Sequence, residues 1–265
     1  MSILKKINTL RNLDWKWASV YYPKRARVYL LYYWAKILGI KSYSVTIGGV
    51  TVLLGFTHPY HHFIAKQCSN LQCEANLWER WVIESKKQPV IWDAGAYNGI
   101  YGLLAAKANP SAKVYILDVD EEAVKHVKAN IELNNLDNAF VIEKALYDST
   151  GSHTFSVTEG GTAGRLSDKG MTIETVSFED LVNKTGTPGL VKLDIEGAEY
   201  KVIKSIVHSP TVILLEVHLQ WIEGGSRDSI LDELKKRNYT STVADDTRSP
   251  YYTGKVTEHY WCATS

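Results

Sequence analysis

Residues 89–99 combine an acid, two glycines and a helix start in an arrangement suited to a nucleotide-type cofactor. A short apolar strand runs into Asp93 and then into a turn that contains Gly95 and Gly99. Glycine lets the backbone of such a turn approach a ligand closely. An amphipathic helix is expected over 100–108, and its first turn presents N–H groups that have no partner within the helix. This segment therefore predicts a cofactor site at the end of a strand.

The next strand indicates which cofactor fits. It is expected over 113–117 and ends in Asp118, where an acid suits the two hydroxyls of a ribose. A dinucleotide fingerprint would need a second close glycine where Tyr97 stands, and Asp93 would repel a diphosphate. The same acid pairs well with a sulfonium or ammonium centre, so S-adenosylmethionine (SAM) fits. The alternative is a tight strand-to-helix turn that binds no ligand.

Charged residues also follow two later strands. They are Asp194 and Glu196 after the strand expected over 190–193, and Glu216 and His218 after the strand expected over 211–215. The carboxyl ends of parallel strands meet at one edge of a sheet, so these residues should lie close to Asp93 and Asp118. So many carboxylates are costly at one edge unless a cation offsets them, such as a substrate amine, a sulfonium, a metal ion, Lys or Arg.

These residues differ in the roles that the sequence suggests. Asp194 precedes a helix and is expected to be functional. Glu196 is a second candidate base, whereas Glu199 is expected to be exposed and only to stabilise the helix start, where the helix dipole favours negative charge. His218 has the most suitable unperturbed pKa for a base, but strand alternation leaves open which way it faces. Asp194 and Glu216 could instead hold a divalent metal.

From residue 90 onward, predicted strands and helices alternate, which indicates a doubly wound, mostly parallel sheet. Helices are expected over 121–134, from Ser177, over 198–207 and near 227–237, and further strands over 139–142, 153–157 and 171–176. The final strands, 239–243 and 256–263, should pair antiparallel because no crossover helix separates them. The fold class is therefore α/β, a Rossmann-like SAM methyltransferase fold that ends in an antiparallel hairpin.

The chain before this domain divides into two parts. Residues 1–43 are predicted to form two helices, and residues 1–41 carry nine Lys and Arg against one acid, a net charge of +8. Such a basic, aromatic-rich arm could dock on a membrane surface or on nucleic acid, or it could be a solvated helical cap. Residues 44–88 are predicted to form a hairpin over 44–54 and a helix over 74–85, leading into the methyltransferase domain at 89–265.

Composition favours an ordinary globular protein with one sizeable core among its 265 residues. No stretch has the length and apolarity of a membrane span, and the N-terminus lacks a secretory pattern. Cys68, Cys73 and Cys262 show no metal-type pairing and suit a reducing compartment, so a cytoplasmic protein is expected, with a peripheral membrane position left open. The histidines after the hairpin are expected to be a solvated or packed cluster rather than a metal site; they are His58, His61 and His62.

Two segments carry a family resemblance. Val191-Lys-Leu-Asp-Ile-Glu-Gly-Ala-Glu-Tyr200 resembles the signature of FkbM-type SAM-dependent methyltransferases, and Val90-Ile-Trp-Asp-Ala-Gly-Ala-Tyr-Asn-Gly99 resembles their cofactor turn. The resemblance covers roughly residues 44–220. It implies that the turn holds the methionine part of SAM, the residues after the second strand hold the ribose, and one residue lies at the adenine edge. The implied cofactor-binding residues are Asp93, Gly95, Ala96, Tyr97, Asn98, Gly99, Asp118, Val119 and Ala145.

This chain departs from the family pattern in two places. Asp118 stands where Glu is usual. Its side chain is one methylene shorter, so Asp120 could also take part in binding the ribose hydroxyls. Tyr97-Asn98 reverses the usual Asn-Ile order, which leaves open which of the two side chains faces the cofactor.

The resemblance implies SAM-dependent O-methylation of a small molecule, a sugar or a lipid-linked hydroxyl. The catalytic candidates are Asp194, Glu196, Glu216 and His218. The glycine-rich loop 158–170 would cover the acceptor, with Arg165 either facing an anionic group or solvated. One alternative is an RNA ribose 2′-O-methyltransferase that uses the basic arm and the group Lys192, Asp194 and Glu216. A second alternative is a binding protein that has the SAM fold but no catalysis.

Overall fold

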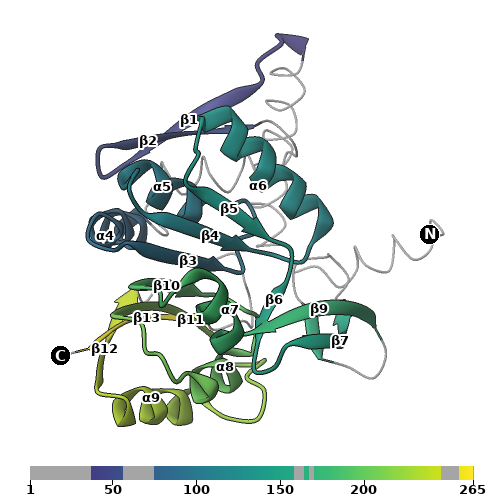
Figure 1. Cartoon of the computed structure of the whole chain (residues 1–265), viewed down its shortest axis with the longest axis vertical. Coiled ribbons are helices and arrows are strands. Elements are labelled where there is room, and N and C mark those ends of the chain that lie inside the picture. The colour runs from purple at the N-terminus through teal and green to yellow at the C-terminus, as the bar shows by residue number, and fades with distance from the viewer. Residues whose placement is uncertain (1–36, 56–74, 158–163, 167–169, 246–256, 265) are drawn as a thin grey trace, which may run out of the picture.

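The computed structural model describes residues 37–55, 75–157, 164–166, 170–245 and 257–264, and its centre is a seven-stranded sheet (Figure 1). The order across the sheet is β12-β13-β11-β10-β3-β4-β5. The strands are β3 (Val90–Ala94), β4 (Lys113–Leu117), β5 (Ala139–Ile142), β10 (Leu190–Leu193), β11 (Val212–His218), β12 (Tyr239–Asp245) and β13 (Thr257–Thr264).

Five neighbouring strands of this sheet, β5, β4, β3, β10 and β11, are parallel, and β13 pairs antiparallel with both β11 and β12. The prediction of a mostly parallel sheet that ends in an antiparallel hairpin is therefore confirmed. The chain builds outward from β3 through β4 and β5 on one side, and from β10 through β11 on the other. The strand order thus reverses between β3 and β10, the place where open α/β sheets bind ligands beyond the carboxyl ends of their strands.

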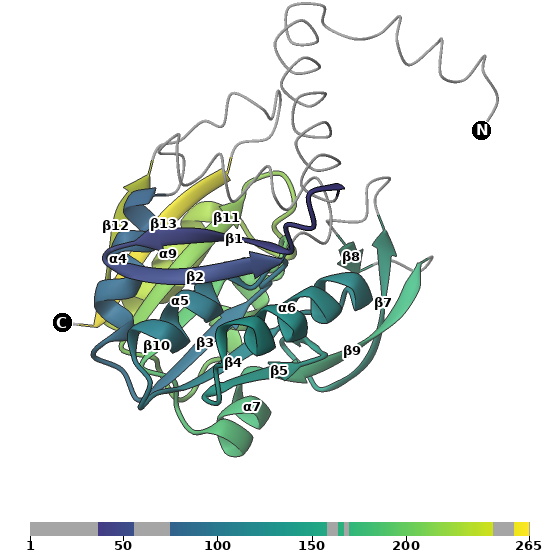
Figure 2. The same cartoon turned by 90° about the horizontal axis from the view of Figure 1, so that it is seen from above.

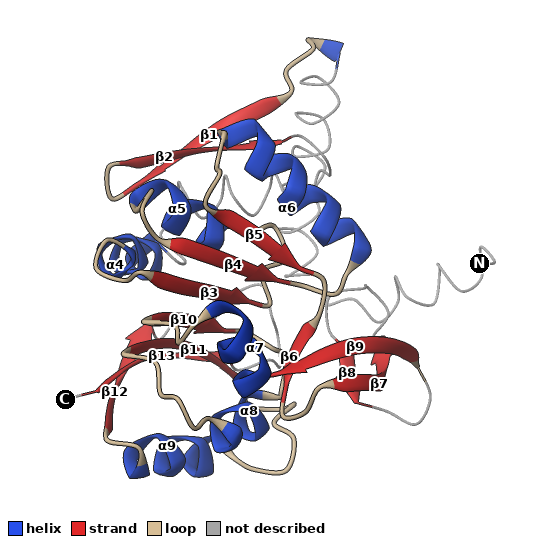
Figure 3. Ribbon diagram, viewed as in Figure 1, coloured by secondary structure: helices blue, strands red, loops and turns tan. Residues whose placement is uncertain are grey.

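Helices cover both faces of the sheet, as Figures 1 and 3 show. One face carries α4 (Ala75–Ser85), α5 (Ile100–Ala108) and α6 (Glu121–Asn134), and the other carries α7 (Phe178–Thr185), α8 (Glu199–Ser205) and α9 (Arg227–Lys236). Strand alternation supplies both cores. In β3, Ile91 joins the core of the first face, while Trp92 joins the second and lies with its ring centroid 4.9 Å from that of Phe178.

Helix α5 is buried on almost every side, because the sheet covers one side of it and a β-hairpin covers another. The hairpin consists of β1 (Ser42–Ile47) and β2 (Val50–Gly55), which pair antiparallel as predicted. Its turn contains Gly48 and Gly49 with φ of 53° and 78°, the two positive values that a type I′ turn needs. Figure 2 shows the hairpin lying across α5 and α6.

Two asparagines of α6 attach the hairpin to the domain. The side chain of Asn134 accepts a hydrogen bond from Leu53 N at 2.7 Å and donates one to Leu53 O at 2.7 Å. One turn earlier, Asn130 Oδ1 accepts a hydrogen bond from Gly55 N at 2.8 Å. Both asparagines are at least 90% buried, and their bonds satisfy backbone groups of a strand that is partly covered.

We expect Asn134→Ala to lower the free energy of unfolding by about 1–3 kcal/mol, since it leaves Leu53 N–H and C=O without their partner. Urea denaturation followed by tryptophan fluorescence would measure the change. Asn183→Ala, at an exposed position of α7, is the matched control and should change stability by less than ~0.5 kcal/mol. Equal effects of the two variants would mean that Asn134 does not hold the hairpin.

A smaller sheet lies beside the end of β5 (Figure 1). It consists of β6 (Ala145–Tyr147), β7 (Gly151–Val157), β8 (Gly164–Leu166) and β9 (Met171–Ser177), in the order β6-β9-β7-β8. Ser177 ends β9 and caps α7, because its hydroxyl accepts a hydrogen bond from Asp180 N at 3.1 Å. The predicted cap at this position is confirmed.

Several predictions fall outside the described residues. They concern residues 1–36 of the basic arm, His58, His61, His62, Cys68, Cys73 and most of the loop 158–170. Cys262 lies within the described part and is fully buried, which raises the pKa of its thiol to about 11. Among the helices that the structure describes, none has both the length and the apolarity needed to cross a bilayer.

Candidate functional site

The turn after β3 is packed directly against the end of β10. Gly95 has a φ of 77°, and a Cβ atom at this position would lie 1.7 Å from Asp194 O. The two strand ends are also joined by a hydrogen bond from Asp194 N to Ala94 O at 3.2 Å. On the other side, Gly95 N and Ala96 N both donate to Leu117 O at 3.1 Å. Glycine is therefore required at 95 by the neighbouring strand itself, in addition to any ligand.

The remainder of the turn leads the chain into α5. Gly99 precedes the helix with a φ of 75°, and a Cβ there would lie 2.9 Å from Val127 Cγ2. Asn98 is 7% exposed and its Oδ1 accepts a hydrogen bond from Ile100 N, so this side chain is used within the turn. Tyr97 is partly exposed and has a φ of 49°, which is rare for a residue that is not glycine.

Asp118 holds this turn from the end of β4. Its Oδ2 accepts a hydrogen bond from Tyr97 N at 2.6 Å, and its Oδ1 accepts from Val119 N at 2.8 Å and Asp120 N at 2.9 Å. Burial raises the pKa of Asp118 despite these bonds, which lower it. Asp120 caps α6 by accepting a hydrogen bond from Ala123 N. Ala145, the remaining predicted cofactor residue, begins β6.

Asp93 lies beneath the turn and faces a buried lysine. The carboxyl group of Asp93 is fully buried, and its Oδ2 accepts a hydrogen bond from Gly102 N at 2.8 Å. Burial raises the pKa of Asp93 to about 6, although Lys192, 3.9 Å from Oδ1, lowers it. Lys192 Nζ also donates to Asp194 Oδ2 at 2.8 Å and to Gly95 O at 3.0 Å. Burial alone lowers the pKa of Lys192, but the charges of Asp194 and Asp93 raise it above its usual value.

The four predicted catalytic residues lie together at the carboxyl end of β10 and β11. His218 Nε2 is 3.4 Å from Glu196 Oε2, 3.5 Å from Glu216 Oε1 and 3.9 Å from Asp194 Oδ1. Asp194 and Glu196 keep 24% and 29% of their side chains exposed, whereas the His218 side chain is only 9% exposed. The question of which way His218 faces is therefore answered, because its ring points into the group of carboxylates.

Burial and mutual charge shift the pKa values of this group strongly. Burial raises the pKa of Glu196 to about 7 and also raises that of Asp194, where Glu216 adds to the effect. Burial lowers the pKa of His218, but Glu199 and the surrounding carboxylates outweigh it and raise the value to about 10. Glu216 has its pKa lowered to about 2, because its histidine neighbours outweigh the effect of its burial. The histidine is thus a cation that offsets the carboxylates at neutral pH.

The prediction that Glu199 is exposed is wrong. Its side chain is fully buried, and its Oε1 accepts hydrogen bonds from Ile195 N at 3.2 Å and Gly197 N at 3.1 Å. The same oxygen lies 3.8 Å from His218 Nδ1. The chain reverses sharply before α8, with Glu196 at a φ of 55°, so the first residue of the helix turns inward under the loop.

Strand β11 is longer than predicted and includes Glu216 and His218. Its pairing with β10 ends at Leu193 and Leu215, but its pairing with β13 continues through His218. The antiparallel partner therefore extends the strand. Alternation then places Glu216 and His218, two residues apart, on the same face of β11.

Three residues at the site were not among the predicted site residues. His259 of β13 pairs in register with Glu216, and its Nε2 lies 3.3 Å from Glu216 Oε2. The ring of Trp221 stacks on that of His218 with centroids 5.3 Å apart and planes at 16°. The third is the buried Lys192, to which the sequence analysis assigned a role only in the alternative of RNA methylation. The predicted hairpin of the last two strands does not identify His259, because His259 reaches Glu216 through the pairing of β13 with β11.

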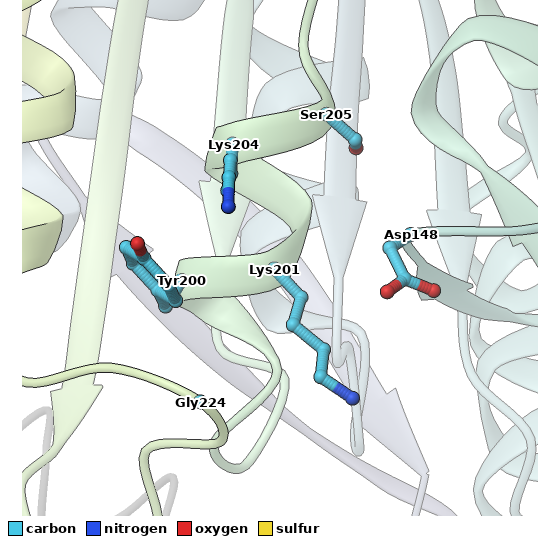
Figure 4. Close-up of a pocket in the computed structure, with 6 residues that line it drawn as sticks. All are labelled: Asp148, Tyr200, Lys201, Lys204, Ser205 and Gly224. Carbon is cyan, nitrogen blue, oxygen red and sulfur yellow. The ribbon is translucent and has the colours of Figure 1, made fainter.

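A separate cavity of about 360 Å³ lies beside α8 (Figure 4). It is lined by Asp148, Tyr200, Lys201, Lys204, Ser205 and Gly224. Lys201 bonds Tyr147 and lies 3.0 Å from Glu223, so its charge is already paired. The predicted site residues do not line this cavity.

Comparison with known proteins identifies the family. A profile described as "Methyltransferase FkbM domain" matches residues 93–241. The hexuronic acid methyltransferase AglP of Haloferax volcanii is 24% identical over 157 residues, which are 56% of this chain and 64% of that protein. The ribosomal protein L11 methyltransferase of Acetivibrio thermocellus is 43% identical over 56 residues, 21% of this chain and 18% of that protein. This chain thus matches less than two thirds of the length of either relative.

Among solved structures, magnesium protoporphyrin IX methyltransferase from Synechocystis PCC 6803, crystallised with SAM, is similar with a TM-score of 0.48 and 12% identity. That alignment covers 78% of this chain and 83% of the other. The family profile spans more than half of the chain, and it contains both the glycine turn that starts at Asp93 and the carboxylate group around His218. The chain therefore belongs to the methyltransferase FkbM domain family.

Proposed function

We propose that this protein transfers a methyl group from SAM to an oxygen atom of a small molecule or glycan. The observation that carries the proposal is the convergence of three carboxylates and a histidine beside the glycine turn, at the point where the strand order reverses. These are Asp194, Glu196, Glu216 and His218. Family membership supplies the reaction class, and the local chemistry supports an oxygen acceptor.

The residues around the turn fit SAM. Gly95 and Gly99 keep side chains out of the turn, which allows a ligand to approach its backbone closely. In this proposal the turn backbone from Gly95 to Gly99 holds the methionine part, and Asp118 with Val119 holds the ribose. When bound, SAM supplies a methyl group activated by its sulfonium.

In the proposed reaction, the carboxylates around His218 bind the methyl acceptor and take up its proton. Methyl transfer needs an oxygen aligned with the methyl group and, for a hydroxyl, a group that takes its proton. Asp194 and Glu196 are the exposed members, so they contact the acceptor and one of them takes the proton. Glu216 lies between His218 and His259, so in this proposal it orients His218 and contributes negative charge beside it.

A sugar is the acceptor class that the comparisons favour. The relative from Haloferax volcanii is a hexuronic acid methyltransferase, and its similarity covers more than half of this chain. The alternatives of RNA ribose methylation and of binding without catalysis stay predictions, since residues 1–36 lie outside the described part. Strongly salt-dependent RNA binding that is lost on deleting residues 1–41 would favour the first alternative.

The proposed activity is tested with isotopically labelled SAM. Purified protein is incubated with cell extract and methyl-labelled SAM, and labelled products are identified by mass spectrometry. We expect label in an O-methylated sugar or glycan, together with release of S-adenosylhomocysteine. A label found only in RNA would contradict the acceptor class, and an absence of turnover despite SAM binding would contradict the enzymatic proposal.

We expect Asp118→Ala to weaken SAM binding by about 10- to 100-fold, because the variant loses the ribose acceptor and frees the turn at Tyr97 N. Isothermal titration calorimetry with SAM measures the dissociation constant. Asp137→Ala, at an exposed position after α6, is the matched control and should bind SAM like the wild type. If Asp118→Ala bound SAM with unchanged affinity, the proposal that the ribose binds at the end of β4 would be wrong.

A further inference from the structure

We infer that Asp194, Glu196 and His218 bind a divalent metal ion of the Mn²⁺ class. One ligand atom from each residue, two carboxylate oxygens and an imidazole nitrogen, lies within 4.8 Å of the others. Together they offer three protein ligands at a partly exposed edge, which is the number that a catalytic metal site uses while it keeps positions open for substrate.

The distances suit ligands of one ion better than direct hydrogen bonds. His218 Nε2 lies 3.4 Å from Glu196 Oε2 and 3.9 Å from Asp194 Oδ1. An N–H···O hydrogen bond spans about 2.7–3.2 Å. Two atoms that each lie about 2.1 Å from a shared ion are about 3–4.2 Å apart, depending on the angle at the ion. The observed separations fall in this second range.

One carboxylate oxygen at the centre of the group is buried without a hydrogen bond. Glu196 Oε2 is inaccessible to solvent and has no hydrogen-bond partner among the residues that the structure describes. It is the atom 3.4 Å from His218 Nε2, and the His218 side chain is 91% buried, given its 9% exposure. A buried acceptor that lacks a partner is costly, and an ion between Glu196 Oε2 and His218 Nε2 would satisfy this oxygen.

Two carboxylates of the group, Asp194 and Glu216, each have one oxygen paired with a neighbouring cationic side chain. Asp194 Oδ2 accepts a hydrogen bond from Lys192 Nζ at 2.8 Å, and Asp194 Oδ1 faces His218. Glu216 Oε2 lies 3.3 Å from His259 Nε2, and Glu216 Oε1 lies 3.5 Å from His218 Nε2. Each of these two carboxylates is thus oriented by a neighbour so that its other oxygen faces the imidazole, and for the ligand Asp194 this matches the outer-shell support of metal ligands.

Glu199 provides the matching support for the imidazole. Its fully buried carboxylate is fixed by two backbone N–H groups, and its Oε1 lies on the Nδ1 side of His218 at 3.8 Å. The negative charge of Glu199 on the Nδ1 side favours a proton on Nδ1 and so leaves the Nε2 lone pair for the ion, while the stacked Trp221 fixes the ring plane. This explains why an acid is buried at the first residue of α8.

The ligand set selects the kind of ion. Carboxylate oxygens favour Mg²⁺, Ca²⁺ and Mn²⁺, and an imidazole nitrogen moves the preference from the first two to Mn²⁺. Resting on the proposed function, the ion would bind the acceptor hydroxyl and lower its pKa, and the hydroxyl proton would pass to a carboxylate of the group.

The test is titration of the full-length, chelator-treated protein with MnCl₂, with free Mn²⁺ measured by electron paramagnetic resonance. We expect one saturable site in the wild type and at least a 100-fold loss of affinity in Glu196→Gln and His218→Gln. Glu199→Gln should weaken binding by about 10- to 100-fold, because it removes only the outer-shell partner. The control is Glu179→Gln, which changes a surface acid paired with His208 and should bind like the wild type.

Circular dichroism and SAM calorimetry on each variant confirm that it is folded. Absence of a saturable Mn²⁺ site in the wild type, or equal affinity in wild type and Glu196→Gln, would overturn the inference. If SAM turnover persists in that case, only the metal is excluded. If Mn²⁺ binds as expected but no methyl group is transferred, the proposed function fails and the metal site stands.

Discussion

Gly95→Ala is expected to destabilise the protein by about 3–5 kcal/mol, a large part of the total stability of a typical domain. The new Cβ would lie 1.7 Å from Asp194 O, a backbone atom held by the pairing of β10 with β3. No side-chain rotation can relieve this overlap, so the two strand ends must separate. The positive φ of 77° adds further strain. Urea denaturation or a thermal melt measures the loss.

Gly49→Ala separates the effect of the steric overlap from the effect of the positive φ. Gly49 has almost the same φ, 78°, but a Cβ there would meet nothing within 4 Å. This control should therefore cost only the conformational strain, about 1–2 kcal/mol. If both variants were equally stable, the contact between the turn and Asp194 would be easily deformed, and the description of the site as one packed unit would be wrong.

Asp194→Asn is expected to lower kcat for methyl transfer by about 10²- to 10⁴-fold, the contribution typical of a general acid–base group. Asparagine can still accept the hydrogen bond from Lys192, so the shape of the edge is kept while the negative charge is lost. The SAM dissociation constant should change by less than about threefold, because Asp194 acts on the acceptor half. Release of S-adenosylhomocysteine with the identified acceptor measures the rate.

The control for this variant is Asp232→Asn, on the exposed side of α9, which should retain wild-type kcat. A rate within tenfold of the wild type in Asp194→Asn would remove this residue from the reaction. A large increase in the SAM dissociation constant would instead place Asp194 in the cofactor half of the site.

Much of the fold could be predicted because its signals are local. The apolar pattern and the cap at Ser177 predicted the helices and strands of the sheet closely, and the glycine pair at 48–49 predicted the hairpin turn. The site edge was also predictable, since parallel strands place their carboxyl ends together. The residues of the signature around Asp194 then indicated the family, which the profile match confirms.

The burial of Glu199 and the role of His259 could not be predicted in the same way. The position of Glu199 depends on the sharp turn at Glu196, where a residue that is not glycine adopts a positive φ against its own preference. His259 reaches Glu216 only through the register of β13, which follows 38 residues after the end of β11 along the chain. Both are effects of tertiary packing, which local patterns do not contain.

One lysine joins the two halves of the site. Lys192 Nζ donates to Gly95 O in the turn that we propose to hold SAM and to Asp194 Oδ2 beside His218, and it also faces Asp93. A shift of either half therefore changes the partners of the same ammonium group. Occupancy of one half should alter the affinity of the other, and by thermodynamic linkage the effect must be equal in both directions. We expect cofactor and acceptor to bind cooperatively rather than as independent ligands.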